Sequence, residues 1–264
     1  MRIRHVLVLL VLSGCLSLLL AISPQQSDAE WYVGGYGGYS LPVMPEKLRD
    51  VQMPLEGERQ AQAQFPQFVP NNVFGNKLTS SLSGSDISLK NSAIFGGKAG
   101  YFFKDEGFSW LGVELEAFTT QPTIKQQTVT TTLDATYIPG SPGPGNEATS
   151  ISQPGTLQLT ESSMRLVTVL FNLIARYPGT TFQPYVGIGG GAFHFSSSGQ
   201  IDGRQVVPGL NAQLGLKVLA TEEWGLFVEG KYNYATITNL DPAGFGFSGV
   251  YSSFNAVAGV AYHF

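Results

Sequence analysis

The last fifteen residues of the chain, 250–264, alternate between two kinds of side chain. Side chains of a β-strand point to opposite faces in turn, so the pattern predicts a strand with one apolar, aromatic face and one smaller, more polar face. The apolar face carries Phe254, Ala256, Ala258, Val260, Tyr262 and Phe264. A membrane barrel strand needs this pattern, because lipid replaces water on one face only. A strand of a soluble sandwich can also alternate, so the choice between a membrane barrel and a soluble sandwich depends on the other segments.

The same alternation recurs between clusters of Gly, Pro, Asp and Asn, which favour turns. It predicts eight strands, at residues 31–40, 92–103, 110–120, 164–176, 182–195, 207–219, 224–237 and 250–264. Short connections at 104–109, 177–181 and 220–223 alternate with longer ones at 41–91, 121–163, 196–206 and 238–249. Outer-membrane barrels join an even number of strands by short periplasmic turns and longer outer loops. The sequence therefore predicts an all-β fold, an eight-stranded antiparallel up-and-down transmembrane β-barrel.

The two longest connections differ in composition. Residues 123–133 and 156–160 are rich in Thr, Val and Leu, and they flank a Pro- and Gly-rich run at 139–146. Because such segments favour strands and a turn, the third and fourth barrel strands are predicted to continue past the membrane as a protruding hairpin. The connection at 41–91 is polar and carries five prolines, so we expect it to be irregular or partly disordered: Pro42, Pro45, Pro54, Pro66 and Pro70.

Aromatic residues gather beside the chain ends and the short turns. The set contains all three tryptophans: Trp31, Phe103, Trp110, Tyr177, Phe182, Trp224 and Phe264. Trp and Tyr prefer the membrane–water interface, where an apolar ring and a polar N–H or O–H are both accommodated. Core aromatics of a soluble sandwich would have no reason to collect at one end. The set therefore predicts a periplasmic aromatic girdle, with both termini periplasmic and the long loops extracellular.

The faces opposite the apolar ones fill the interior. They carry six charges: Lys98, Glu114, Glu116, Lys217, Glu229 and Lys231. Buried charges are stable when paired, and an eight-stranded barrel is only just wide enough for its own side chains. We expect these residues to form a lumenal charge network, paired between adjacent strands, that plugs the barrel. The strand at 164–176 stays undecided, because Val167 and Phe171 lie on one face and Leu166 and Leu170 on the other.

The front of the chain has the pattern of a secretory signal peptide. Basic Arg2 and Arg4 precede an apolar run at 6–22 and small residues up to Ala29. Residues 1–29 are therefore predicted to be removed, leaving 30–264 as the barrel with its long loops at 41–91 and 121–163. A transmembrane anchor is the alternative, but the run is shorter than the usual span of about 20 residues.

Residues 12–15 also fit a lipoprotein signal, although Cys15 lies in the middle of the apolar run rather than at its end. Lipidation of Cys15 stays open. Cys15 is the single cysteine, so cleavage after Ala29 would leave no disulfide and no cysteine metal site. His5 falls in the signal and His263 stands alone, so no metal and no cofactor are expected.

The net charge of the chain limits the classes of partner that it is expected to bind. The 15 basic residues less Arg2 and Arg4, against the 19 acidic residues less Asp28, give the mature chain a net charge of about −5. No basic stripe is present to neutralise phosphates, so nucleic acid is not expected as a partner. The remaining glycine- and aromatic-rich chain, without long apolar runs, is typical of a membrane barrel. Its expected partners are outer-membrane lipid and lipopolysaccharide, and we expect a monomer.

Two glycine-rich segments resemble a known family. Residues 31–39, WYVGGYGGY, look like the first strand, and 183–191, QPYVGIGGG, like the fifth strand, of the opacity-like outer-membrane β-barrel family. That family is similar in turn to the membrane domain of outer-membrane protein A. The resemblance implies an eight-stranded barrel at the bacterial surface, with adhesive or host-contact roles in some members and no catalytic motif. It also implies that the terminal aromatic, Phe264, is read by the barrel assembly machinery.

One segment raises the question of catalysis. His194 and Ser196 resemble the His-x-Ser pair of the lipid A deacylases, which are also eight-stranded barrels with a Glu on the neighbouring strand. That motif continues with Asn, whereas Ser197 follows here, and Glu229 is predicted to be lumenal. An interfacial histidine followed by a serine-rich loop is the simpler interpretation. We therefore expect no enzyme, and no P-loop or dinucleotide motif is present.

Three functions remain in order of preference. The first is a non-enzymatic outer-membrane surface barrel that displays extracellular loops for adhesion, host contact or envelope structure. The second is a narrow porin-like channel or a conduit for small hydrophobic solutes. The third is a lipid A-modifying hydrolase. Any extracellular ligand is expected to bind the long loops, whose composition does not identify it.

Overall fold

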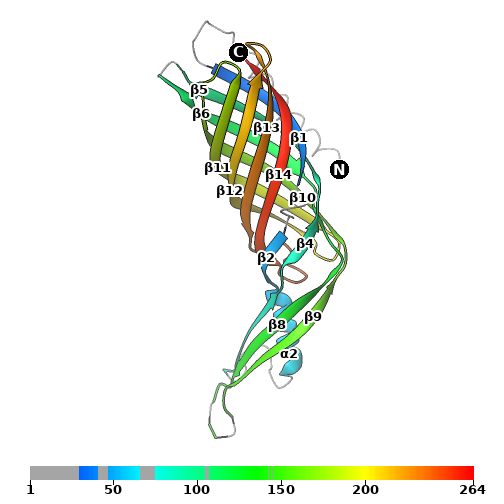
Figure 1. Cartoon of the computed structure of the whole chain (residues 1–264). Helices are drawn as coiled ribbons and strands as arrows, with labels where there is room; N and C mark the ends of the chain where they lie inside the picture. Colours follow the sequence, from blue (N-terminus) through cyan, green and yellow to red (C-terminus); the bar gives the residue numbers. More distant parts are fainter. Residues whose placement is uncertain (1–29, 41–46, 66–74, 105–106, 142, 145) are drawn as a thin grey trace, which may run out of the picture.

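Eight long strands form the body of the molecule in a computed structural model that describes residues 30–40, 47–65, 75–104, 107–141, 143–144 and 146–264. They are β1 (Glu30–Ser40), β5 (Ala93–Phe103), β6 (Phe108–Thr120), β10 (Ser162–Arg176), β11 (Phe182–Ser198), β12 (Gly203–Leu219), β13 (Trp224–Ile237) and β14 (Ser248–His263). Each pairs antiparallel with the next, β1 pairs with β14, and the ring closes (Figure 1). The predicted eight-stranded barrel is confirmed. The predicted signal segment 1–29, with Cys15, lies outside the described residues.

The strand limits follow the alternation closely, with one correction. The connection expected at 196–206 is reduced to residues 199–202, because β11 and β12 stay paired as far as Ser197 and Gly203. Once a hairpin leaves the membrane, water solvates both of its faces. The alternation can then be lost while the ladder of backbone hydrogen bonds continues. At the other end of the barrel, Trp31 and Phe264 exchange backbone hydrogen bonds of 3.3 and 3.0 Å.

The two longest connections build an extension beyond the end of the barrel that is opposite the C-terminus (Figure 1). Its elements are β2 (Lys47–Gln52), α2 (Pro54–Gln64), β3 (Lys77–Gly84), β4 (Ile87–Lys90), β7 (Thr123–Ile124), β8 (Gln127–Ile138) and β9 (Thr149–Leu159). The predicted hairpin is confirmed, since β8 pairs with β9 over eleven residue pairs. No helix among the described residues is long and apolar enough to cross a membrane.

The expectation of an irregular first connection is wrong for its described part. Its residues bury apolar side chains, such as Val51 and Leu82, against one face of β8. Gly57 lets α2 approach β3 closely, because a Cβ there would lie 3.0 Å from the Cβ of Leu82. Pro54 begins α2, where its missing N–H costs nothing. The other four prolines of this connection lie outside the described residues.

Candidate functional site

The middle of the barrel holds five of the six predicted lumenal charges in one cluster. Lys98 Nζ lies 2.8 Å from Glu229 and 3.3 Å from Glu114. Lys231 pairs with Glu116 and lies 2.6 Å from Glu229. The side chains of Lys231, Glu116 and Glu229 have no exposed surface. These five residues, Lys98, Glu114, Glu116, Glu229 and Lys231, are called the charge cluster below.

The pairing within the charge cluster agrees only in part with the expectation of neighbouring strands, since Lys98 of β5 pairs with Glu114 of β6 but other pairs cross the bore. Lys98 stands opposite Glu116 in the β5–β6 ladder, yet one of its partners, Glu229, is on β13 across the bore. Lys231 of β13 likewise reaches Glu116 of β6. In so narrow a barrel, long side chains meet across the bore as readily as along the wall. Glu229 therefore links both lysines and joins opposite walls.

Tyrosines and amides complete the polar contacts of the three carboxylates. Tyr32 donates a hydrogen bond of 2.6 Å to Glu114, Tyr185 donates one of 2.7 Å to Glu229, and Tyr36 donates to Glu116. Asn172 bridges Glu114 and Glu116 at 3.1 and 3.2 Å, and Gln213 donates to Glu114 at 2.9 Å. Buried polar groups are stable when their hydrogen bonds are satisfied, so this shell lets the charges remain inside.

Three of the barrel glycines are explained by these tyrosine side chains. Each of the three tyrosines that contact the carboxylates stands directly opposite a glycine of the next strand: Tyr32 opposite Gly100, Tyr36 opposite Gly96, and Tyr185 opposite Gly215. A Cβ on any of these glycines would lie 2.4 or 2.5 Å from the tyrosine ring. The missing side chain lets the ring lie across the strand and aim its hydroxyl at a carboxylate. This pairing was not deduced from the sequence, although Tyr and Gly alternate visibly in residues 31–39.

Lys217, the sixth predicted member, is buried but lies apart from the charge cluster. Its Nζ is 3.2 Å from His263 and 4.3 Å from the centre of the Tyr32 ring, and it forms no ion pair with a carboxylate among the described residues. It belongs instead to a second group near the C-terminal end, where Arg176 pairs with Glu30 and Glu30 lies 2.6 Å from His263. This group was not predicted from the sequence, because its members come from strand ends, where alternation is a weak guide.

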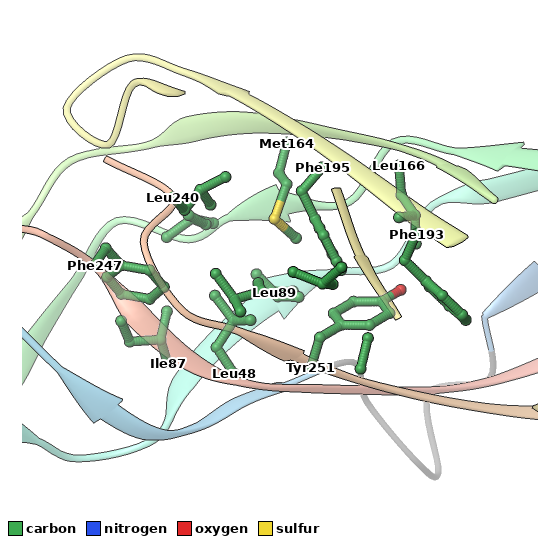
Figure 2. Packing of buried hydrophobic residues seen from close by; sticks show 14 of the residues in the cluster. Leu48, Ile87, Leu89, Met164, Leu166, Phe193, Phe195, Leu240, Phe247 and Tyr251 are labelled. Atoms are coloured by element: carbon green, nitrogen blue, oxygen red, sulfur yellow. The ribbon is translucent and has the colours of Figure 1, made fainter. Parts of the chain in front are cut away.

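The other end of the bore is closed by an apolar layer. Figure 2 shows its labelled side chains: Leu48, Ile87, Leu89, Met164, Leu166, Phe193, Phe195, Leu240, Phe247 and Tyr251. They come from the barrel strands β10, β11 and β14, from the extension strands β2 and β4, and from the last loop. Phe195 and Tyr251 pack edge to face at 5.3 Å, and neither has any exposed surface. We call this layer the apolar cap.

The apolar cap resolves the orientation of β10. Leu166 and Leu170 are 1% exposed and point inward, whereas Val167 and Phe171 are 37% and 59% exposed and point outward. Both faces of this strand are apolar because the lumen itself is apolar near the cap. Local alternation therefore cannot separate the lipid face from the lumenal face here.

The outside of the barrel is apolar and the outside of the extension is polar. Among the described residues, every exposed large hydrophobic side chain except Ile138 lies on a barrel strand, in a short turn or at the C-terminal end. Ile188 and Leu214, for example, are 66% and 65% exposed. The exposed positions of β9 are instead Thr149, Ser150, Ser152, Gln153, Pro154, Gly155, Thr156 and Gln158. A continuous apolar surface around a barrel is unfavourable in water and is the kind of surface that lipid covers in membrane barrels.

All seven residues of the predicted girdle lie at the C-terminal end of the barrel, beside its strand ends and short turns. Four of these rings contact two further tyrosines that were not predicted as part of the girdle. Tyr101 contacts Trp31 and Phe103, and Tyr262 contacts Trp224 and Phe264, with ring centres 4.9 to 6.1 Å apart. The alternation of residues 250–264 already placed Tyr262 on the outward face, and Tyr101 shares the outward alternation of its own strand.

His194 and Ser196 lie on the outer surface without a carboxylate beside them. His194 stands opposite Val167 and Val206, and Ser196 opposite Arg165 and Arg204. The acid of a triad would have to come from these neighbouring strands. The pairing places valines and arginines there instead.

Comparisons with known proteins add only a general likeness. No family model matches the chain, and a search of the curated proteins found no match. Similar solved structures include Neisserial surface protein A (14% identity, TM-score 0.44, covering 90% of this chain and 100% of that one). Ail, the attachment invasion locus protein of Yersinia pestis, follows, solved with the heparin analogue sucrose octasulfate (12%, 0.41, 89% and 98%). The outer membrane protease OmpT of Escherichia coli is another (11%, 0.36, 92% and 99%). The fold assignment rests on the strand pairing of this chain.

Proposed function

We propose that this chain is a non-enzymatic surface protein of the bacterial outer membrane. Its barrel is a closed anchor that holds the extension, built on β3, β8 and β9, in the water outside the cell. The observation that carries the proposal is the contrast between the two surfaces. The barrel exposes Ile188, Leu214 and their neighbours, whereas β9 exposes Thr, Ser and Gln. One part suits lipid and the other suits water.

The closed interior argues against the channel alternative. An open pore would leave lumenal side chains accessible to water, yet Lys231, Phe193 and Phe195 have no exposed surface. A cavity between Lys98 and Lys217 measures about 10 Å³, which is room for about one water molecule. The charge cluster and the apolar cap therefore block the bore at two levels.

The extension is the part that could meet a partner. Adhesion, host contact and envelope structure are the roles that such a display serves. The hydrolase alternative would require an acid beside His194 and Ser196, and the neighbouring strands place none opposite them. We infer a non-catalytic role from that arrangement.

Cysteine labelling tests the orientation. Ser152 is exposed on β9, and Lys104 lies in a short turn at the opposite end. The natural Cys15 falls in the segment expected to be removed. On intact cells, a maleimide that cannot cross membranes should label Ser152→Cys but not Lys104→Cys. Both should react after the cells are broken, and labelling of Lys104→Cys alone on intact cells would show the opposite orientation.

The closed bore predicts no ion conduction. Purified protein inserted in a planar lipid bilayer should give no steady current, because the charge cluster and the apolar cap fill the lumen with packed side chains at two levels. A porin of known conductance, inserted in the same way, provides the control. A reproducible current from the unmodified protein would favour the channel alternative.

Phe264 is expected to guide assembly. Its ring is 41% exposed and stacks on Tyr262 at the rim, 6.1 Å between centres. Phe264→Asp should reduce the amount of folded protein in the outer membrane without blocking export, because it removes an interfacial aromatic and the proposed contact with the barrel assembly machinery. The measurement is the fraction of heat-modifiable protein in outer-membrane extracts. Phe182→Asp, at the same rim but far from the C-terminus, separates loss of interfacial burial from loss of the terminal signal.

A further inference from the structure

Two outward-facing arginines stand at the end of the barrel beside the extension. Arg165 of β10 and Arg204 of β12 are both exposed, and Ser196 of β11 lies between them in register with each. Adjacent strands are about 4.8 Å apart, so the two arginine backbones are separated by about 10 Å and their side chains can converge on one group. Neither arginine forms an ion pair with another described residue.

Their height along the barrel matches the edge of the lipid. The outward positions of β12 between Val206 and Leu216 are apolar or small. At ~3.3 Å per residue and a tilt of ~40°, this stretch spans about 25 Å along the membrane normal, which is the usual height of the apolar band of such barrels. Arg204 is the next outward residue beyond Val206, and Arg165 is the next beyond Val167. Both therefore lie at the level of lipid headgroups.

A groove continues from Arg165 along the outer wall. It has a volume of about 590 Å³ and runs over β1, β5, β6 and β10. Amide and hydroxyl side chains such as Asn91, Gln121 and Thr123 line it together with Tyr39 and Phe95, and Arg165 supplies the one charge of its lining. Amides and hydroxyls suit the hydroxyl groups of a sugar, and an exposed aromatic ring suits an acyl chain beside it.

We propose that this rim site binds the phosphorylated sugar headgroup of an outer-leaflet glycolipid. Arg165 and Arg204 hold the phosphate, Ser196 donates to it between them, and the groove takes the adjoining sugar. Guanidinium groups fit phosphate oxygens in bidentate fashion, which the point charge of a lysine ammonium does not reproduce. The lipid source is favoured over free phosphate because Val167, Val206 and Phe95 lie directly below, where acyl chains run. The inference rests on the proposed outer-membrane location.

Lipid titration tests the site. Wild-type protein in phosphatidylcholine nanodiscs is titrated with a bisphosphorylated, hexaacylated glucosamine disaccharide, and separately with its dephosphorylated form, and bound copies are counted by native mass spectrometry. The wild type should bind the phosphorylated form at least about tenfold more tightly, because charge-assisted hydrogen bonds of two arginines are involved. Arg165→Gln combined with Arg204→Gln should remove that preference. Lys77→Gln combined with Lys104→Gln removes the same charge elsewhere and should keep it.

Three results would overturn the site: equal binding of the two lipid forms by the wild type, wild-type affinity in the arginine double variant, or loss of binding in the lysine control. Full competition by soluble glucosamine phosphate at equal concentration would also overturn it, since the ligand would then not be a lipid. Heat-modifiable mobility of every variant shows that each is folded. Insertion into the nanodisc and the cysteine labelling test the membrane location independently of lipid preference.

Discussion

Replacing Lys231 with methionine is expected to lower the free energy of unfolding by about 3–5 kcal/mol, the cost of leaving a buried charge without its partner. Lys231 is the partner of both Glu116 and Glu229, and its side chain has no exposed surface. Methionine keeps most of the volume and removes the charge. Lys98 would then face three buried carboxylates alone. The measurement is the denaturant midpoint in detergent micelles, followed by tryptophan fluorescence.

Glu229→Gln provides the contrast within the charge cluster. It leaves Lys98 and Lys231 with the two carboxylates of Glu114 and Glu116, so positive and negative charges balance. Its expected cost is smaller, about 1–3 kcal/mol, from hydrogen bonds to a charged group that are weakened. The variant that combines Lys231→Met with Glu229→Gln should lose less stability than the sum of the two single losses, because the two residues are in direct contact.

Lys77→Met, on the exposed face of β3, removes a charge outside the barrel and should leave the midpoint nearly unchanged. A Lys231→Met protein as stable as this control would contradict the charge cluster. So would a larger loss from Glu229→Gln than from Lys231→Met, since the order of the two follows from the count of buried charges.

Gly100→Ala is expected to destabilise the barrel strongly, although it adds only one methyl group to the wall. The new Cβ would lie 2.4 Å from the Tyr32 ring, which must move and release Glu114. Overpacking together with a lost hydrogen bond to a carboxylate should cost about 2–4 kcal/mol. The same micelle denaturation experiment measures it. Combining Gly100→Ala with Tyr32→Leu should recover part of the packing loss, because the smaller side chain leaves room for the methyl group.

Gly97→Ala is the matched control on the same strand. Gly97 lies on the alternate face of β5, where an added Cβ meets only one backbone oxygen at 3.4 Å, an ordinary contact. Its stability should differ from wild type by less than about 0.5 kcal/mol. If both alanine variants were equally stable, the pairing of tyrosine over glycine would have no structural role.

The sequence was most informative where lipid acts on the chain. Lipid favours apolar side chains on the outward face, so the outward face of most barrel strands between Trp31 and Phe264 can be recognised from local alternation. The alternation was sufficient to predict the number of strands, the short turns and the burial of Lys98, Glu229 and Lys231. It failed for β10, where the apolar cap gives the lumenal face the same character as the lipid face.

By itself, then, the sequence determined which side of each regular strand meets lipid, because that choice depends on one residue at a time. Only the tertiary structure decided which side chains are in contact inside the barrel. Lys98 and Glu229 are separated by 131 positions, and their contact across the bore depends on how all eight strands are staggered. The same stagger places Lys217 beside His263 rather than in the charge cluster. The tertiary structure also folds Leu48 and Ile87, two residues of the first connection, into the apolar cap that closes the barrel.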